Sequence, residues 1–138
     1  MKRYFLDTNV ILRFLMKDDP VQSPKAALLF AAADAGECAL AVTRDVIAES
    51  EWVLRSYYKI ERSVIATQLS ELIRRSGLTV PDGAVLLDGL SRYRETKLDI
   101  VDCLLAAAAS ADGSGVATFD RGIGKHFEDV ILWVNAAE

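Results

Sequence analysis

The 138-residue chain contains only two cysteines and one histidine. Cys38 and Cys103 are far apart in sequence and have no cysteine or histidine beside them at metal-ligand spacing, so the pattern predicts neither a disulfide nor a zinc site. The single histidine, His126, excludes a histidine-rich metal centre. Any metal that this chain binds is therefore expected to use oxygen ligands.

Long apolar runs are also missing. No segment approaches the roughly 20 apolar residues that a membrane-spanning helix needs, and the apolar stretch 26–33, which stops at Asp34, fits a buried helix. Residues 1–6 begin like a signal peptide, but Asp7 and Arg13 interrupt any apolar region. We therefore expect a soluble, cytoplasmic protein without a membrane partner.

The chain has no excess of basic residues and no linker. Its net charge is −4, which argues against a general nucleic-acid binder but allows an acidic pocket that binds its substrate through a metal. No Gly-, Ser- or Pro-rich stretch separates two compositions. At this length the chain is expected to form one domain, residues 1–138.

Short apolar segments alternate with helical patterns along the chain. We expect strands at 4–6, 38–42, 78–80, 116–118 and 130–134, and helices at 10–16, 20–35, 45–58, 63–75, 84–94 and 99–111. This alternation predicts an α/β fold, with three α/β/α layers around a central parallel sheet of about five short strands. In such sheets the functional crevice lies beyond the carboxyl ends of the strands.

Local signals set the expected helix ends and faces. Thr8 or Asn9 is predicted to cap the first helix, Pro20 to lie in the first turn of the second, and Thr43 to cap the helix at 45–58. Two helix faces are predicted to be apolar: Val46, Ile47, Val53, Leu54 and Tyr57 on one helix, and Ile65, Leu69, Leu72 and Ile73 on the next. Trp52, Tyr57 and Tyr58 are expected to belong to the core, with a dimer interface as the alternative.

Acidic residues gather at the predicted strand ends. Asp7 follows the first strand and Asp120 the fourth, Asp99 and Asp102 open the helix before the fourth strand, and Glu49 lies one turn into the helix after the second. If the strands are parallel, these side chains can converge at one edge of the sheet.

Such convergence needs a reason, because two carboxylates about 4 Å apart repel by roughly 4 kcal/mol at an effective dielectric of 20. A divalent cation reverses this penalty, since it favours ionised ligands. Hard oxygen ligands without sulfur or imidazole select Mg²⁺ or Mn²⁺.

Each aspartate also has an explanation that needs no metal. Asp7 could favour the positive end of the first helix, Asp99 could be an N-cap with Asp102 in the first turn, and Asp120 could be a turn residue. Four such coincidences at one sheet edge are improbable, and this joint placement favours the metal site.

Helical periodicity leaves the glutamate undecided. Glu49 and Glu51 lie on opposite edges of the apolar stripe at about the same distance from it. Asp45, one turn before Glu49, either shares the site or faces water.

Four segments that carry these acids resemble the motifs of PIN-domain proteins, and specifically of the VapC-type toxins of type II toxin–antitoxin systems. They are FLDTNVI at 5–11, ESEWVLRS at 49–56, DIVDCLLAA at 99–107 and ATFD at 117–120. Each motif alone is weak, but they occur in the family's order, and the resemblance extends from residue 5 to about 134.

The resemblance implies roles for individual residues. It selects Glu49 over Glu51 and makes Asp102 a ligand with Asp99 as an accessory acid, and it places Thr118 close to the metal. The implied catalytic and metal-binding set is Asp7, Glu49, Asp102 and Asp120, with Thr8 and Asn9 as further accessory positions.

The family further implies a Mg²⁺- or Mn²⁺-dependent endoribonuclease that cuts a structured RNA such as tRNA or rRNA. It implies a homodimer inhibited by a cognate antitoxin whose C-terminal segment covers the active site. The candidate phosphate contacts are the basic residues near the motifs: Arg13, Lys17, Arg44, Arg55, Arg121 and Lys125.

Three other functions were weighed against the nuclease. A receiver-like Mg²⁺-binding signalling domain would lack the long helix of Glu49 and carry a lysine after its last strand. A phosphatase of the haloacid dehalogenase type needs an acid at the position of Asn9. A degenerate PIN domain that only binds RNA or a partner is disfavoured by the complete acidic set.

Overall fold

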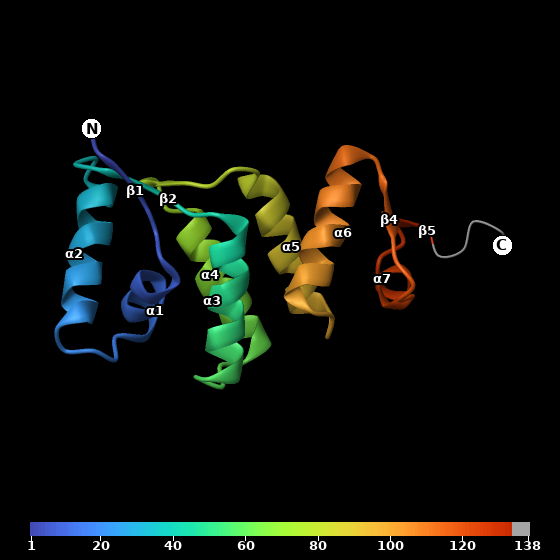
Figure 1. Ribbon diagram of the computed structural model, residues 1–138, viewed down its shortest axis with the longest axis horizontal. Helices are drawn as coiled ribbons and strands as arrows, with labels where there is room; N and C mark the ends of the chain where they lie inside the picture. The colour runs from blue at the N-terminus through green and yellow to red at the C-terminus, as the bar shows by residue number, and fades with distance from the viewer. Residues whose placement is uncertain (134–138) are drawn as a thin grey trace. The chain divides into compact units, whose positions relative to one another are not determined.

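The computed structural model describes residues 1–133, which form seven helices and five short strands (Figure 1). In chain order these are β1 (Arg3–Phe5), α1 (Thr8–Met16), α2 (Gln22–Asp34), β2 (Ala39–Ala41), α3 (Arg44–Ser56), α4 (Arg62–Ile73), β3 (Leu78–Thr79), α5 (Gly83–Glu95), α6 (Ile100–Asp112), β4 (Gly115–Ala117), α7 (Gly122–His126) and β5 (Ile131–Trp133). All strand pairs are parallel, so the predicted α/β class is confirmed. Val134, the last residue of the fifth predicted strand, lies outside the described residues.

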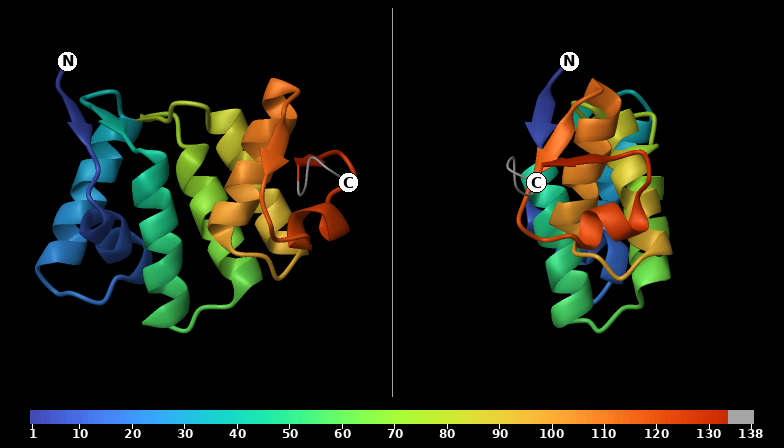
Figure 2. Two further views of the ribbon diagram at one scale, coloured as in Figure 1. Left: turned by 45° about the vertical axis from the view of Figure 1, so that its right-hand side comes forward. Right: turned by 90° about the vertical axis from the view of Figure 1, so that its right-hand side faces the viewer.

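The first compact part of the chain, Met1–Gly83, contains a three-stranded sheet of order β1-β2-β3. Tyr4 pairs with Leu40, and Leu40 pairs with Leu78. Helix α1 packs against α2 and α3, and α3 packs beside α4 (Figure 2). The side chains that fill this part are fully buried and mostly branched aliphatic: Ile11, Leu40, Ile47, Leu54, Ile65 and Leu69. The predicted apolar face at 63–75 is thereby confirmed.

The second part, which begins at Ala84, contains α5, α6, α7 and the parallel pair β4–β5. Helix α5 lies very close to α6 at Gly89, where an added Cβ would come within 2.6 Å of the Leu104 Cδ2 atom. Any larger residue would require the Leu104 side chain to move, and the Leu104 Cα at 3.3 Å leaves little room for the added Cβ. The close packing positions the start of α6, which carries Asp99 and Asp102.

The expectation of one five-stranded sheet was wrong in its pairing. The described residues place three strands in one sheet and two in another. Each strand has only two or three residues, so each pairing rests on few ladder hydrogen bonds. A sequence pattern of such short strands gives their number and direction but not their partners.

Two of the three predicted helix starts were wrong. Helix α1 begins at Thr8 itself, with Asp7 at the N-cap position, so neither Thr8 nor Asn9 caps it. Pro20 precedes α2; there the Asp19 carboxylate accepts hydrogen bonds from the backbone N–H groups of Val21 and Gln22, at 2.9 and 2.7 Å. The prediction for Thr43 is confirmed, because its hydroxyl accepts from the Val46 N–H at 3.4 Å.

The buried face of α3 differs from the predicted stripe. Ile47 and Leu54 are buried as expected, but Tyr57 is 75% exposed and Trp52 is 59% exposed, so these two aromatics are not core residues. Ser50 and Glu51 are buried instead, so the buried face of α3 is turned around the helix axis relative to the predicted face. Both have local hydrogen-bond partners, Ser50 the Val46 carbonyl and Glu51 the Arg55 side chain, which lower the cost of burial.

Helix α7 was not predicted, since its five residues are too few for a periodic pattern. The described residues contain no helix long and apolar enough to cross a membrane.

An ion-pair cluster around Arg92 fastens the loop after α7 to α5. The Arg92 guanidinium donates to both carboxylate oxygens of Asp129, to Oδ1 at 2.9 Å, and its Nε donates to Asp88 at 3.1 Å. It also stacks on the Phe127 ring, 4.8 Å from the centroid. Arg92, followed by the Ser110 hydroxyl, holds the pKa of Asp129 well below its usual range.

We expect Asp129→Asn to lower the free energy of unfolding by about 1 kcal/mol at pH 7, a value discounted for the solvent exposure of the carboxylate. Because the pKa of Asp129 is lowered in the folded protein, its stabilisation is complete above the ordinary carboxyl pKa and is lost as the pH falls through the folded value. Urea unfolding at pH 7 and at pH 3 measures both effects. The exposed neighbour Glu128 supplies the control, Glu128→Gln, and an equal loss of stability in both variants would contradict the prediction.

Candidate functional site

Asp7 stands where β1 ends and α1 begins. The Leu6 N–H continues the β1–β2 ladder to the Ala41 carbonyl at 2.8 Å, and the Asp7 carbonyl accepts the first helical bonds of α1, from Val10 at 3.1 Å and from Ile11 at 3.3 Å. Its side chain makes no capping hydrogen bond and is exposed. The helix start therefore does not use the carboxylate, which is left for another ligand.

Glu49 lies on the exposed edge of α3, where its Oε1 atom accepts a hydrogen bond from the Thr8 hydroxyl. Thr8 is only 5% exposed, so the hydroxyl is fixed next to Asp7. This contact between α1 and α3 brings the first two predicted acids to neighbouring positions in the first part of the chain.

Glu51 has a different environment, although it lies on the same helix. It is 1% exposed, and its Oε2 atom accepts from the Arg55 Nε at 2.8 Å. The structure thus separates the two glutamates that helical periodicity could not separate. It assigns Glu51 to an internal ion pair and leaves Glu49 with Thr8. Asp45, in the first turn of α3, is exposed.

In the second part, Asp99 occupies the N-cap position of α6. Its carbonyl accepts from the Cys103 N–H at 3.1 Å, but its carboxylate, like that of Asp7, makes no capping hydrogen bond. Asp102 follows in the first turn and is half-buried. Burial, followed by the charges of Asp99 and Asp120, raises the pKa of Asp102. The negative charges of Asp99 and Asp120 therefore act on Asp102.

Asp120 lies in the loop after β4, which its own backbone and side chain stabilise. Its Oδ1 atom accepts from the Gly122 N–H at 2.9 Å, and its backbone N–H donates to the Thr118 hydroxyl at 3.0 Å. An added Cβ on Gly122 would lie 3.2 Å from Oδ1. The predicted role of Asp120 as a turn residue therefore accounts for one of its carboxylate oxygens. The Thr118 hydroxyl contacts the backbone of Asp120 and not its carboxylate.

The predicted phosphate contacts fall into two groups. The Arg13 guanidinium donates to Asp18 at 3.0 Å and to the Tyr58 hydroxyl at 2.9 Å, and Arg55 pairs with Glu51, so both are used within the protein. The others are exposed: Lys17, Arg44, Arg121 and Lys125.

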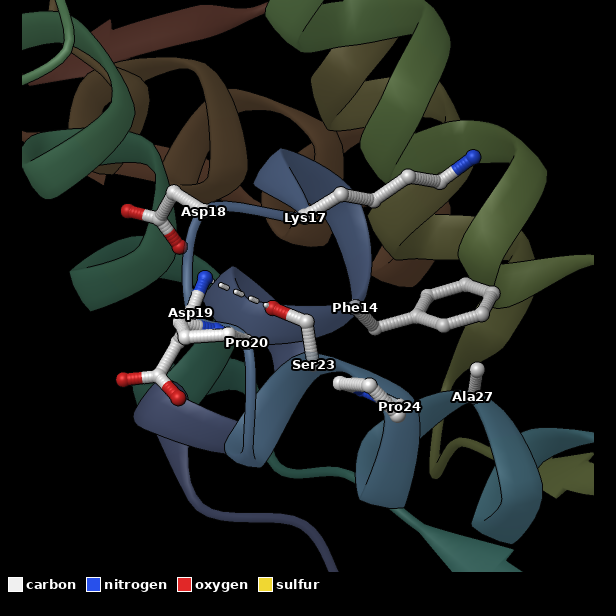
Figure 3. A pocket seen from close by; sticks show the side chains of 8 residues that line it. All are labelled: Phe14, Lys17, Asp18, Asp19, Pro20, Ser23, Pro24 and Ala27. Carbon is white, nitrogen blue, oxygen red and sulfur yellow. Dashed lines mark hydrogen bonds between the residues drawn. The ribbon is translucent and has the colours of Figure 1, made fainter.

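A hollow of about 500 Å³ lies at the end of α1 that is remote from Asp7 (Figure 3). Phe14 and Lys17 come from the end of α1, and Pro24 and Ala27 come from the start of α2. The polar groups nearby serve the turn between the helices, since the Asp19 N–H donates to the Ser23 hydroxyl at 3.2 Å. This hollow contains one predicted phosphate contact, Lys17, and none of the predicted acidic site residues.

A second hollow, of about 460 Å³, lies between α1 and α2 beside Asp7, and we call it the α1–α2 groove. It is lined by Asp7, Asn9, Val10, Arg13, Gln22, Lys25, Ala26 and Leu29. Sequence reasoning missed the contribution of α2. The signal was present in the spacing of Gln22, Lys25, Ala26 and Leu29, which places them on one helix face.

The donor set fits a hard divalent cation. No group of three or more acidic, histidine or cysteine side chains within residues 1–133 is arranged to hold a metal ion. However, Asp7 and Asp99 occupy cap positions without capping, and the pKa of Asp102 is raised by burial and by neighbouring negative charge. A cation would relieve that repulsion and favour the ionised carboxylates, and oxygen ligands of this kind suit Mg²⁺ or Mn²⁺.

The described part of the chain is an α/β protein with parallel strands, in which Asp7 follows β1 and Asp120 follows β4. The sequence matches the PIN domain family over residues 4–128, a span that includes every predicted site residue. The chain therefore belongs to the PIN-domain family, whose members are generally metal-dependent nucleases that bind RNA. No curated protein matches it in a search.

Proposed function

We propose that this protein is a Mg²⁺- or Mn²⁺-dependent endoribonuclease in which Asp7, Glu49, Asp102 and Asp120 bind the metal, with Asp99 as an accessory acid. The observation that carries this proposal is that Asp7 and Asp99 begin α1 and α6 without capping them. Aspartates at N-cap positions ordinarily accept a hydrogen bond from the helix backbone. Two that do not, in a PIN-domain protein, fit a metal-binding role.

The residues around the carboxylates have defined tasks in this proposal. Thr8 holds Glu49 through its hydroxyl, and Thr118 and the Gly122 N–H hold the loop that presents Asp120. Asp99 adds negative charge beside Asp102 and so strengthens its attraction for a cation. When bound, the metal supplies an activated water and stabilises charge on the phosphate oxygens.

We further propose that the protein is the toxin of a VapC-type toxin–antitoxin pair, acting in the cytoplasm as one domain, residues 1–138. Its substrate would be a structured RNA such as tRNA or rRNA, and its partners a cognate antitoxin and a second copy of the chain. The four motifs at 5–11, 49–56, 99–107 and 117–120 support this assignment. Lys17, Arg44, Arg121 and Lys125 are the exposed candidates for phosphate contacts.

The test is incubation of the purified protein with total RNA in Mg²⁺, Mn²⁺ or EDTA, alongside Asp7→Asn. We expect discrete cleavage products that require the metal and are absent with Asp7→Asn. The matched control is Asp82→Asn, which removes the same charge at an exposed position whose φ of +56° asparagine tolerates. No cleavage by folded, antitoxin-free protein with either metal would instead favour a degenerate PIN domain that only binds RNA or a partner.

Incubation with acetyl phosphate distinguishes the nuclease from a receiver-like domain, because a receiver-like domain would form a stable phospho-aspartate. The nuclease is expected to remain unmodified, as read by intact mass.

A further inference from the structure

The α1–α2 groove combines two cationic side chains, two side-chain amides and an apolar floor beside Asp7. One wall is α1, with Asn9, Val10 and Arg13, and the other is the face of α2 that carries Gln22 and Lys25. The two helices lie side by side in Figure 1. Both helices belong to the first part of the chain and pack against each other. The groove is therefore built within the first part of the chain.

The free positive charge in the groove belongs to Lys25. Lys25 is exposed, and it forms no ion pair with any residue that the structure describes. Arg13 also lines the groove, but its charge is matched by Asp18. The unmatched ammonium group of Lys25 can contact one phosphate of an RNA strand. The next phosphate along the strand would then lie at Asp7, where a metal ion would bind it.

Arg13 has a second effect, because it orients the amide of Gln22. The Arg13 Nε donates to the Gln22 Oε1 at 3.2 Å, so the remaining amide N–H₂ group of Gln22 is a donor. Asn9, exposed on the opposite wall, supplies another amide. Amide groups of this kind read the hydrogen-bonding edges of unstacked bases.

The floor of the groove is apolar. Ala26 is buried, but Val10 and Leu29 are half-buried, and the exposed part of their aliphatic surface is available to a planar ring. The volume of about 460 Å³ falls within the range of pockets that bind small organic groups. It is suited to one nucleotide and too small for a folded protein segment.

We propose that the α1–α2 groove binds one nucleotide of the RNA substrate next to the reacting phosphodiester, with Lys25 on its phosphate and Gln22 and Asn9 on its base. This inference rests on the proposed ribonuclease function and adds a specificity-determining subsite to it. Arg13 is a positioning residue that acts through Gln22.

The test measures binding of fluorescein-labelled single-stranded RNA decamers by anisotropy, in EDTA, to full-length protein carrying Asp102→Asn to prevent cleavage. Lys25→Ala is expected to weaken binding about five- to tenfold at 0.1 M salt. It should also reduce the slope of log affinity against log salt by about 0.7, the value for one lost phosphate contact on a single strand. Gln22→Ala is expected to reduce the differences in affinity among decamers of A, C and U.

Lys2→Ala is the matched control, because Lys2 is exposed and precedes β1, at the end of the strand opposite to Asp7. Unchanged affinity and salt slope in Lys25→Ala, or an equal change in Lys2→Ala, would overturn the subsite. Cleavage of total RNA by protein with Asp102 intact is scored separately. Cleavage together with an unaffected Lys25→Ala removes only the subsite, whereas RNA binding that depends on Lys25 without any cleavage removes only the nuclease.

Discussion

Replacing Asp102 with asparagine is expected to lower the rate of RNA cleavage by about a thousandfold and, at the same time, to stabilise the metal-free protein. The rate falls because metal stabilisation of transition-state charge is worth several kcal/mol, and each 1.36 kcal/mol is a factor of ten. Stability rises because the folded protein holds a half-buried carboxylate next to the charges of Asp99 and Asp120. Asparagine keeps the shape and removes the charge.

The pH dependence gives the sign of the stability effect. The pKa of Asp102 is raised in the folded protein, so this group stabilises the fold below its unfolded pKa, and that contribution is lost as the pH rises through the folded value. The advantage of Asp102→Asn over the wild type should therefore be larger at pH 7 than at pH 4. Urea unfolding in EDTA at the two pH values measures it.

Magnesium is expected to reverse the order of stability, so that the wild type becomes more stable than Asp102→Asn. A cation that binds only the native protein raises its melting temperature, and we expect this shift in the wild type but not in Asp102→Asn. The control is Asp112→Asn at the opposite end of α6, where the carboxylate accepts from Ser114. If Asp112→Asn abolished the magnesium shift equally, the assignment of Asp102 as a ligand would be wrong.

Replacing Glu51 with glutamine is expected to reduce stability, whereas replacing Glu49 is expected to reduce activity. Glu51→Gln should lower the free energy of unfolding by about 2 kcal/mol, because breaking a buried ion pair costs about 3–5 kcal/mol and the partner is partly solvated. Glu51 is 1% exposed, while the Arg55 side chain is 44% exposed. Glu49→Gln should change stability by less than about 0.5 kcal/mol, as is usual for exposed positions.

Activity distinguishes the same two variants. Glu49→Gln should lower cleavage by about a hundredfold, the loss of roughly 2.7 kcal/mol of transition-state stabilisation. Glu51→Gln, measured below its melting temperature, should retain nearly full activity. Chemical unfolding and initial cleavage rates on the same preparations decide the matter, and a Glu49→Gln variant with normal activity would return the site to Glu51 or Asp45.

Hydrophobic periodicity predicted the features of this fold that arise locally. The α4 face of Ile65, Leu69 and Leu72 is buried as expected, because one amphipathic helix needs one apolar stripe. The Thr43 cap depended only on a side chain and the backbone three residues later. Both features are encoded within a single turn or helix.

Features that depend on distant residues were not predictable in this way. Glu51 is buried because α3 presents it inward with Arg55, and its spacing equals that of Glu49 on the other edge of the stripe. The sequence predicts Thr8 or Asn9 as the cap of α1, yet the Thr8 hydroxyl donates to Glu49, 41 positions away. For the proposed site, the acidic residues and their order could be predicted from the sequence, whereas the α2 wall of the groove is seen only in the structure.

The unused caps of α1 and α6 have a consequence for laboratory evolution. A well-made N-cap contributes about 1 kcal/mol to helix stability, and the side chains of Asp7 and Asp99 forgo that contribution. Serine or threonine at these two positions would complete the hydrogen bonding of the first helical turn. Selection of a variant library for heat resistance alone would therefore enrich replacements at positions 7 and 99, and the most thermostable survivors would be inert.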